Sequence, residues 1–190
     1  MADRFRLTIA QLNPTMGDLA GNAAQVRDAW EKGKAAGADM VALPELFIAG
    51  YNPQDLPMKH VFTLDCMAAV KRLAEDCADG PTLGIGTPWV EGTELYNAYV
   101  ICRDGKMMTQ VFKHHLPNYN VFDELRIFDS GPIGGPYAVG NTRVGSPICE
   151  DAWYEDVAET LAETGAEFLL IPNGSPYFRN KYETRLNKMV

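Results

Sequence analysis

The chain has 190 residues, of which 46% are hydrophobic and 22% charged, as is ordinary for a globular domain. This length suffices for one α/β domain with a buried core, and no apolar run is long enough to cross a bilayer. The net charge of −8, without any cluster of Lys and Arg, argues against nucleic acid as a partner.

The first half of the chain alternates strand and helix patterns. RLTIAQL (Arg6–Leu12) alternates like a strand, and the apolar run Met40–Leu43 is consistent with a buried strand. Helical spacing covers Ala20–Ala36, which Gly37 ends, and Val61–Ala78, which an Asp-Gly-Pro sequence closes.

The second half of the chain begins with neighbouring strands and then returns to alternating helices and strands. The predicted strands are Thr82–Gly86, Leu95–Cys102, Lys106–Phe112, two short strands within Tyr137–Cys149, and Glu167–Ile171. Helices are predicted at Glu155–Thr164 and from Asn180 onward. This order favours an α/β layer fold with a mixed sheet. No linker divides residues 1–190, and the helical pattern that still runs at Val190 predicts a chain truncated at its C-terminus.

The four cysteines, Cys66, Cys77, Cys102 and Cys149, form no CxxC pair and have no metal-ligand spacing. The N-terminus has mixed charges and only a short apolar stretch, so it is not a signal peptide. We therefore expect a cytoplasmic protein with reduced thiols and no metal site. One of the four thiols is then available as a nucleophile.

Three predicted strands each end in a reactive side chain. MVALPE ends in Glu45, MMTQVFK ends in Lys113, and RVGSPIC ends in Cys149. Ligands and catalytic groups gather at strand ends in α/β folds, because the loops there open onto a crevice. Taken singly, each residue has a commoner structural explanation: a small buried apolar residue, a solvated turn residue or a surface charge.

A Glu, a Lys and a Cys in one pocket can hydrolyse an amide. The lysine lowers the pKa of the thiol, and the carboxylate takes the thiol proton and later activates water. When the thiolate attacks the amide carbon, the lysine and a backbone N–H near the cysteine can hold the oxyanion. Ammonia leaves, and water then hydrolyses the thioester.

The surrounding sequence decides between these explanations. LPELF at Leu43–Phe47, FKHHLPNYNVFDE at Phe112–Glu124 and PICEDAW at Pro147–Trp153 together resemble the nitrilase, or carbon–nitrogen hydrolase, superfamily. More narrowly, these motifs, the opening RLTIAQLNPTMGDLAGN and the later NGSPYFRNK resemble the glutaminase domain of glutamine-dependent NAD synthetases. The resemblance covers essentially the whole chain. It implies an α-β-β-α sandwich with mixed sheets that pairs in oligomers.

The resemblance also implies roles for individual residues. Glu45 matches the general base, Lys113 the lysine that stabilises the tetrahedral intermediate, and Cys149 the nucleophile. Glu124 matches a second glutamate that supports the lysine and the attacking water; a surface helix or turn residue is the alternative. We interpret His114 and His115 as positional, because the reaction already has its base.

Six further positions match the glutamine-binding residues of the synthetases: Tyr51, Tyr119, Phe122, Glu150, Ser175 and Lys181. In this interpretation Glu150 pairs with the α-ammonium, and Ser175 and Lys181 hold the α-carboxylate. The alternative for the aromatic residues is ordinary packing. Lys181 is a departure in chemistry, because an arginine would clamp the carboxylate with two parallel bonds and a lysine cannot. The acidic residue directly after Cys149 suits an amino-acid substrate.

The implied function is hydrolysis of glutamine through a Cys thioester, which supplies ammonia for ATP-dependent amidation of deamido-NAD. The ATP domain of the synthetases is expected to be absent, because neither a Ser-Gly-Gly-x-Asp-Ser loop nor a Walker A sequence occurs. The glycine-rich Ser130–Gly135 lacks their lysine and context. No cofactor is therefore expected in this domain, and ATP and Mg²⁺ are expected only in the missing one.

Two other functions remain open at this point. The chain can be a stand-alone omega-amidase or aliphatic amidase that acts on small carboxamides, which relative activity on glutamine and simple amides would distinguish. It can also be an inactive nitrilase-like interaction module, which the intact Glu45, Lys113 and Cys149 set argues against.

Overall fold

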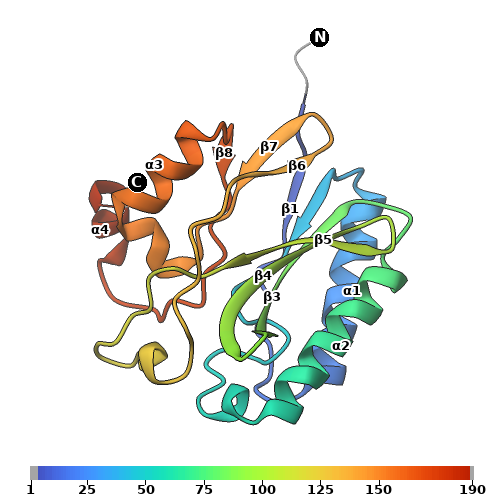
Figure 1. The fold of residues 1–190 in the computed structure, drawn as a ribbon. Coiled ribbons are helices and arrows are strands. Elements are labelled where there is room, and N and C mark those ends of the chain that lie inside the picture. The colour runs from blue at the N-terminus through green and yellow to red at the C-terminus, as the bar shows by residue number, and fades with distance from the viewer. Residues whose placement is uncertain (1–3, 189–190) are drawn as a thin grey trace.

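A five-stranded mixed sheet forms the first half of the structure, a computed structural model that describes residues 4–188 (Figure 1). Its strands are, in spatial order, β1 (Leu7–Ile9), β2 (Met40–Ala42), β3 (Thr82–Glu91), β4 (Glu94–Arg103) and β5 (Lys106–Phe112). β1, β2 and β3 are parallel, whereas β4 is antiparallel to both β3 and β5. Most of β3 and β4 is buried, because both faces of the sheet are covered.

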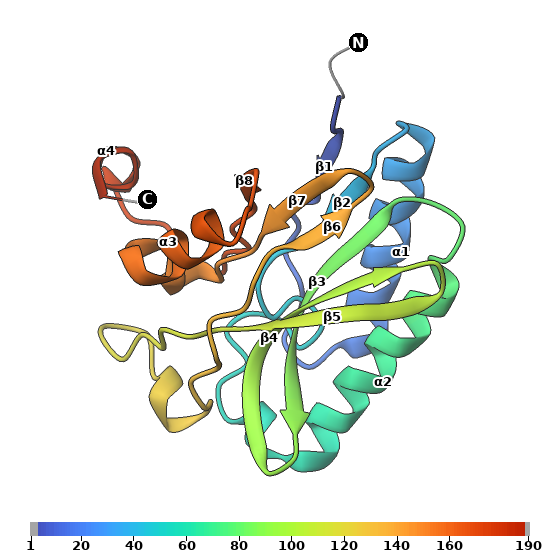
Figure 2. The ribbon, with the colours of Figure 1, turned by 45° about the horizontal axis from the view of Figure 1, so that its top comes forward.

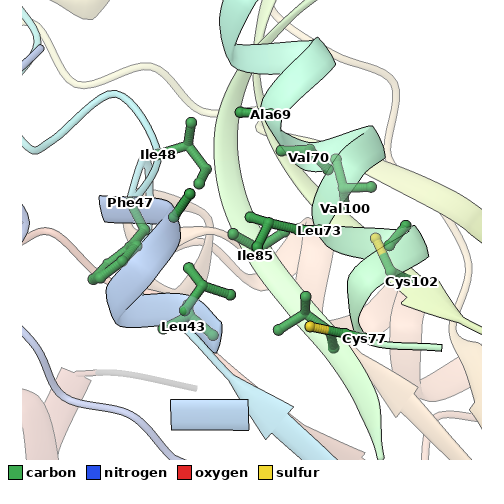
Figure 3. Packing of buried hydrophobic residues seen from close by; sticks show 14 of the residues in the cluster. Leu43, Phe47, Ile48, Ala69, Val70, Leu73, Cys77, Ile85, Val100 and Cys102 are labelled. Atoms are coloured by element: carbon green, nitrogen blue, oxygen red, sulfur yellow. The ribbon is translucent and has the colours of Figure 1, made fainter. Parts of the chain in front are cut away.

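Two helices, α1 (Leu19–Ala35) and α2 (His60–Asp76), lie side by side on one face of this sheet (Figures 1 and 2). Their apolar faces and that side of the sheet form the larger hydrophobic core. Figure 3 shows Val70 and Leu73 of α2 packed against Ile85 of β3 and Val100 of β4. Burial of these side chains fixes the sheet against the helices and holds the ends of its strands in place.

A second, three-stranded sheet packs on the opposite face of the first. It consists of β6 (Tyr137–Val139), β7 (Thr142–Gly145) and β8 (Phe168–Leu169), and α3 (Glu155–Glu163) and α4 (Lys181–Lys188) follow β7 and β8 in the chain. Tyr99 and Ile101 of β4 share a second core with Tyr137 and Val144 of this sheet. Leu161 of α3 lies against β7. The predicted α-β-β-α sandwich with mixed sheets is therefore confirmed.

The predicted elements all occur, but several boundaries were wrong. The strand expected to run to Cys149 ends at Gly145, because Pro147 has no N–H for the sheet and Cys149 has a left-handed φ of 49°. β3 continues past Gly86 to Glu91, since it pairs along its whole length with β4 in a hairpin.

Two expectations from composition can be compared with the structure. No helix within residues 4–188 has the length and apolarity to cross a membrane. All four cysteines are free thiols, as the sequence predicted, and all four are buried.

Candidate active site

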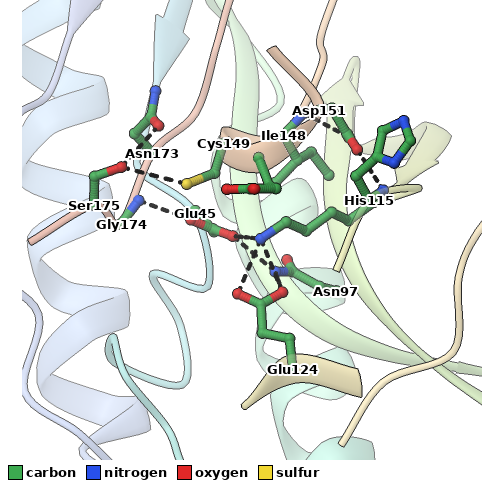
Figure 4. A network of polar contacts seen from close by, with 12 residues as sticks. Glu45, Asn97, His115, Glu124, Ile148, Cys149, Asp151, Asn173, Gly174 and Ser175 are labelled. Atoms are coloured by element: carbon green, nitrogen blue, oxygen red, sulfur yellow. Dashed lines mark hydrogen bonds and ion pairs between the residues drawn. The ribbon is translucent and has the colours of Figure 1, made fainter. Parts of the chain in front are cut away.

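The reactive residues that end three strands meet in the structure. Glu45 lies in the turn after β2, Lys113 directly follows β5, and Cys149 begins a short 3₁₀ helix, η3 (Cys149–Trp153), after β7 (Figure 4). A side chain at Gly86 would overlap the backbone of the Glu45 turn, so glycine allows β3 to pass close behind it. Both sheets therefore contribute to one site.

Lys113 is the centre of a buried hydrogen-bond network. Its Nζ donates to Glu45 Oε1 at 2.7 Å and to Glu124 Oε1 and Oε2 at 2.9 and 2.8 Å. The Lys113 and Glu45 side chains are fully buried, and Glu124, in the 3₁₀ helix η2 (Glu124–Arg126), is nearly so. Glu124 is thus not the surface residue of the alternative interpretation.

The charges of this network are unequal, because two carboxylates share one ammonium. Burial lowers the pKa of Lys113, but the charges of Glu45 and Glu124 raise it by more than burial lowers it. Lys113 therefore stays protonated. Burial and the nearby Glu45 raise the pKa of Glu124 to about 7, against the opposing effect of Lys113. Near neutral pH the network therefore gains and loses a proton at Glu124.

Two groups that sequence reasoning missed fix the carboxylates. Asn97 of β4 donates from Nδ2 to Glu45 Oε1 at 2.8 Å and to Glu124 Oε2 at 3.5 Å. The backbone N–H of Gly174 donates to Glu45 Oε2 at 2.8 Å. Asn97 is buried within a strand and belongs to no motif, so its only signal was a polar residue among the apolar residues YNAYV.

Cys149 is held in a strained position at the start of η3. Its φ is 49°, its N–H donates to the carbonyl of Pro172 at 3.0 Å, and its Sγ lies 3.4 Å from Oγ of Ser175. Burial, followed by the charge of Glu45, raises the pKa of the thiol to about 12, although Lys113 lowers it. The expectation that the lysine activates the thiol was therefore incomplete: its effect has the predicted sign but is outweighed.

Three of the predicted glutamine-binding residues come together beside the nucleophile. The Tyr119 hydroxyl donates to Glu150 Oε2 at 2.8 Å, and the rings of Tyr119 and Phe122 meet edge to face at 5.4 Å. Glu150 and Phe122 are buried, whereas Tyr119 is 49% exposed. This group presents a carboxylate with an aromatic wall next to Cys149, which suits an ammonium bound beside methylene groups.

The other three predicted binding residues have separate surroundings. Tyr51 packs its ring against Gly174, and its buried hydroxyl has no partner within residues 4–188. Ser175 and Lys181 line a cavity of about 760 Å³ whose wall includes neither Glu45 nor Cys149. Lys181 Nζ lies 5.7 Å from the Trp153 ring. Binding of a carboxylate by Ser175 and Lys181 stays a prediction.

His114 and His115 bond to residues outside the catalytic network. His114 Nδ1 is 2.7 Å from the Gly131 carbonyl, and His115 Nε2 is 2.8 Å from Asp156 Oδ1. Possible ligand atoms of His114, His115 and Asp156 lie within 4.8 Å of one another, and each of these bonds uses one of the two nitrogens of its ring. The arrangement agrees with our interpretation that both histidines are positional.

Comparison with known proteins places this geometry in a family. Residues 6–189 match the carbon–nitrogen hydrolase family. The chain belongs to this family. It is 54% identical over 185 residues to a glutamine-dependent NAD(+) synthetase of Rhodobacter capsulatus and 36% identical over 180 residues to that of Aquifex aeolicus. These alignments cover 97% and 94% of the chain but only 34% and 31% of those relatives, so the chain spans about a third of their length.

Solved structures of the family share the fold. A glutamine-dependent NAD+ synthetase from Acinetobacter baumannii, solved with ADP, superposes with a TM-score of 0.90 at 28% identity, over 95% of this chain and 34% of that one. An amidase from Nesterenkonia sp. superposes with a TM-score of 0.84 at 20% identity, over 98% of this chain and 71% of that one. The predicted family and the predicted nitrilase-type fold are thus confirmed.

Proposed function

We propose that this chain hydrolyses the side-chain amide of glutamine and supplies the ammonia for ATP-dependent amidation of deamido-NAD to NAD. The observation that carries the proposal is the buried Glu45–Lys113–Glu124 network beside Cys149, with the Glu150 carboxylate next to the nucleophile. The glutamine-dependent NAD(+) synthetases that it resembles support the choice of substrate and pathway.

Attack begins from a protonated thiol. Because the pKa of Cys149 is about 12, almost no thiolate exists at neutral pH, and the proton must leave as the C–S bond forms. Glu45 is the base: its carboxylate takes the thiol proton while Sγ attacks the amide carbon, and the carbonyl electrons move onto oxygen. A buried base whose two oxygens are held by three hydrogen bonds has little freedom to leave the required geometry.

The oxyanion needs donors that are free to meet it. The N–H of Cys149 is bound to Pro172, so it is not one of them. The next N–H, that of Glu150, has no backbone acceptor within residues 4–188 and lies at the start of η3, where helical N–H groups lack partners. We assign the oxyanion to this N–H and to Lys113 Nζ.

The protonation state of Glu124 controls how much of Lys113 is available. When Glu124 is ionised, both of its oxygens accept from Nζ and the network carries one excess negative charge. When Glu124 is protonated, it offers one acceptor fewer to the Lys113 ammonium. One N–H of the ammonium is then free to donate to the oxyanion. The neutral form of Glu124 is therefore the form that favours attack.

The remaining steps return the enzyme to its starting state. Glu45 gives its proton to the amide nitrogen, the C–N bond breaks, ammonia leaves, and a γ-glutamyl thioester remains on Cys149. Glu45 then takes a proton from water, whose oxygen attacks the thioester carbon. The C–S bond breaks, the thiol regains its proton, and glutamate is released, so that glutamine and water give glutamate and ammonia.

The proposal places ATP and Mg²⁺ in a separate synthetase domain and no cofactor in this one. A cytoplasmic location and a homo-oligomer are also part of it; cell fractionation and light scattering test them.

A second candidate is an amidase for small carboxamides, which the shared fold of the Nesterenkonia amidase favours. Ammonia release from glutamine and from propionamide, measured on the same preparation, separates the two. Glutamine is expected to give the highest kcat/KM, because Glu150 recognises an α-ammonium that propionamide lacks. Replacement by Glu150→Gln should remove that preference and leave propionamide hydrolysis unchanged. If propionamide is the better substrate, the proposal fails.

A further inference from the structure

A single buried carboxylate joins the two chain segments that carry Lys113 and Cys149. Asp151 Oδ1 accepts the backbone N–H groups of His114 at 3.1 Å and His115 at 2.7 Å, and its Oδ2 accepts that of Ile148 at 2.9 Å (Figure 4). His114 directly follows Lys113 in the sequence, and Ile148 directly precedes Cys149.

These two segments belong to different sheets. Lys113 extends β5 of the five-stranded sheet, whereas Cys149 follows β7 of the three-stranded sheet. Neither sheet by itself determines how far the lysine stands from the sulfur. The Asp151 carboxylate therefore links the two segments directly. Its bonds reach the residue that follows Lys113 and the residue that precedes Cys149.

We propose that Asp151 is a positioning residue that sets the distance of the Lys113 ammonium from Cys149. This inference rests on the function proposed above. Asp151 is 1% exposed, and within residues 4–188 its side chain bonds only to backbone N–H groups, so it acts through its neighbours and not on the substrate. A role confined to capping η3 would need only the Ile148 bond. Capping of η3 does not explain the two bonds from the backbone N–H groups of His114 and His115.

The geometry also shows why an ionised carboxylate is needed. Three N–H donors converge on two oxygens, and each oxygen of a carboxylate is an acceptor. An asparagine has one acceptor and one NH₂ group, so it can serve either the His114 and His115 pair or Ile148, but not both. Asp151→Asn thus removes one half of the connection and changes the volume of the side chain very little.

The test compares Asp151→Asn with Asp156→Asn. Asp156 is a matched control, because it also contacts His115, but it is itself exposed and bonds to the imidazole, outside the network. We expect Asp151→Asn to lower the glutaminase kcat roughly 30-fold or more and to change KM less than about 3-fold, as for a displaced catalytic group. Asp156→Asn should leave both constants within about 2-fold of the parent, since no catalytic group moves.

A second measurement does not depend on glutamine. Lys113 favours the thiolate of Cys149, so a displaced lysine should slow labelling of Cys149 by chloroacetamide at a fixed pH and move the pH profile of labelling upward. This readout remains informative if the chain turns out not to hydrolyse glutamine. Peptide mapping and Cys149→Ala identify the labelled site.

The outcomes separate positioning from simple stabilisation. If Asp151→Asn lowers the melting temperature but leaves kcat and the labelling profile unchanged, Asp151 is only a cap and the proposal fails. If Asp151→Asn does not fold, Asp151→Glu, which retains the charge, takes its place. If both variants unfold while Asp156→Asn folds, Asp151 is required for folding and the positioning role is withdrawn.

Discussion

Replacement of Glu45 by glutamine separates the general base from its structural surroundings. The Glu45 carboxylate accepts Lys113 and Asn97 on Oε1 and the Gly174 N–H on Oε2. Glutamine has the same shape, but one of its terminal atoms is a donor. Whichever way the amide turns, an NH₂ group faces an N–H, and the base is lost.

The expected losses of activity and stability differ in size. A general base contributes about 10²- to 10⁴-fold, so we expect glutaminase kcat/KM to fall roughly 10³-fold. The unmatched donor costs about 1–3 kcal/mol of unfolding free energy. Part of this cost is offset, because burial and then Glu45 raise the pKa of Glu124, and loss of the Glu45 charge lowers that pKa and favours the ion pair of Glu124 with Lys113. The variant should therefore remain folded.

The reactivity of the thiol should change in the opposite direction. Glu45 raises the pKa of Cys149, so Glu45→Gln lowers it and speeds alkylation by chloroacetamide at pH 8–9. The assay follows ammonia release, the mass of labelled protein and thermal melting on one preparation. Glutaminase activity within about 10-fold of the parent would refute the base assignment. Alkylation that slows together with catalysis, in a folded protein, would refute the electrostatic reasoning.

Three further predictions concern the nucleophile, the titrating glutamate and the missed asparagine. Cys149→Ala should abolish glutaminase activity and leave ammonia-dependent NAD synthesis in a full-length synthetase; retained glutaminase activity would exclude Cys149. Because the pKa of Glu124 is about 7 in the folded protein against 4.5 in the unfolded one, the native state binds the extra proton between these values. Unfolding free energy should therefore decrease as pH rises across this window, by at most about 1.4 kcal/mol per pH unit from this group. Because the neutral form of Glu124 favours attack, kcat/KM should also decline above pH 7. Glu124→Gln should remove the pH dependence of both the unfolding free energy and kcat/KM. If urea melts and rate profiles of the variant keep these dependences, another group titrates. Asn97→Ala should lower kcat about 10-fold and stability by about 1–3 kcal/mol, since two carboxylates lose a buried donor; a kcat within 2-fold of the parent would mean that Asn97 does not orient Glu45.

The order of the helices and strands along the chain, and the positions of the reactive residues near strand ends, followed from the sequence. Alternation, helical spacing and turn residues mark elements locally, and the end of each marked strand was already a reactive residue at Glu45, Lys113 and Cys149. The sandwich itself came from the family resemblance, because no local pattern shows which faces of two sheets pack together.

The electrostatic features of the site could not be predicted in the same way. The raised pKa of Glu124 depends on burial beside Glu45, 79 residues away along the chain, and on a lysine shared between them. Asn97 and Asp151 act through bonds to groups on other elements, and no regular spacing in the sequence indicates these bonds. Long-range contacts of single polar residues carry little sequence signal unless many related sequences are compared.

The central claim is that glutamine is cleaved through a covalent intermediate on Cys149. The most direct measurement is a mass spectrum of the protein mixed with glutamine and quenched in acid within milliseconds to seconds. The account predicts a mass increase of one γ-glutamyl group, located by digestion on the peptide that contains Cys149, absent in Cys149→Ala and decaying as glutamate appears. Steady release of ammonia without this adduct, or with equal rates in Cys149→Ala, would contradict it.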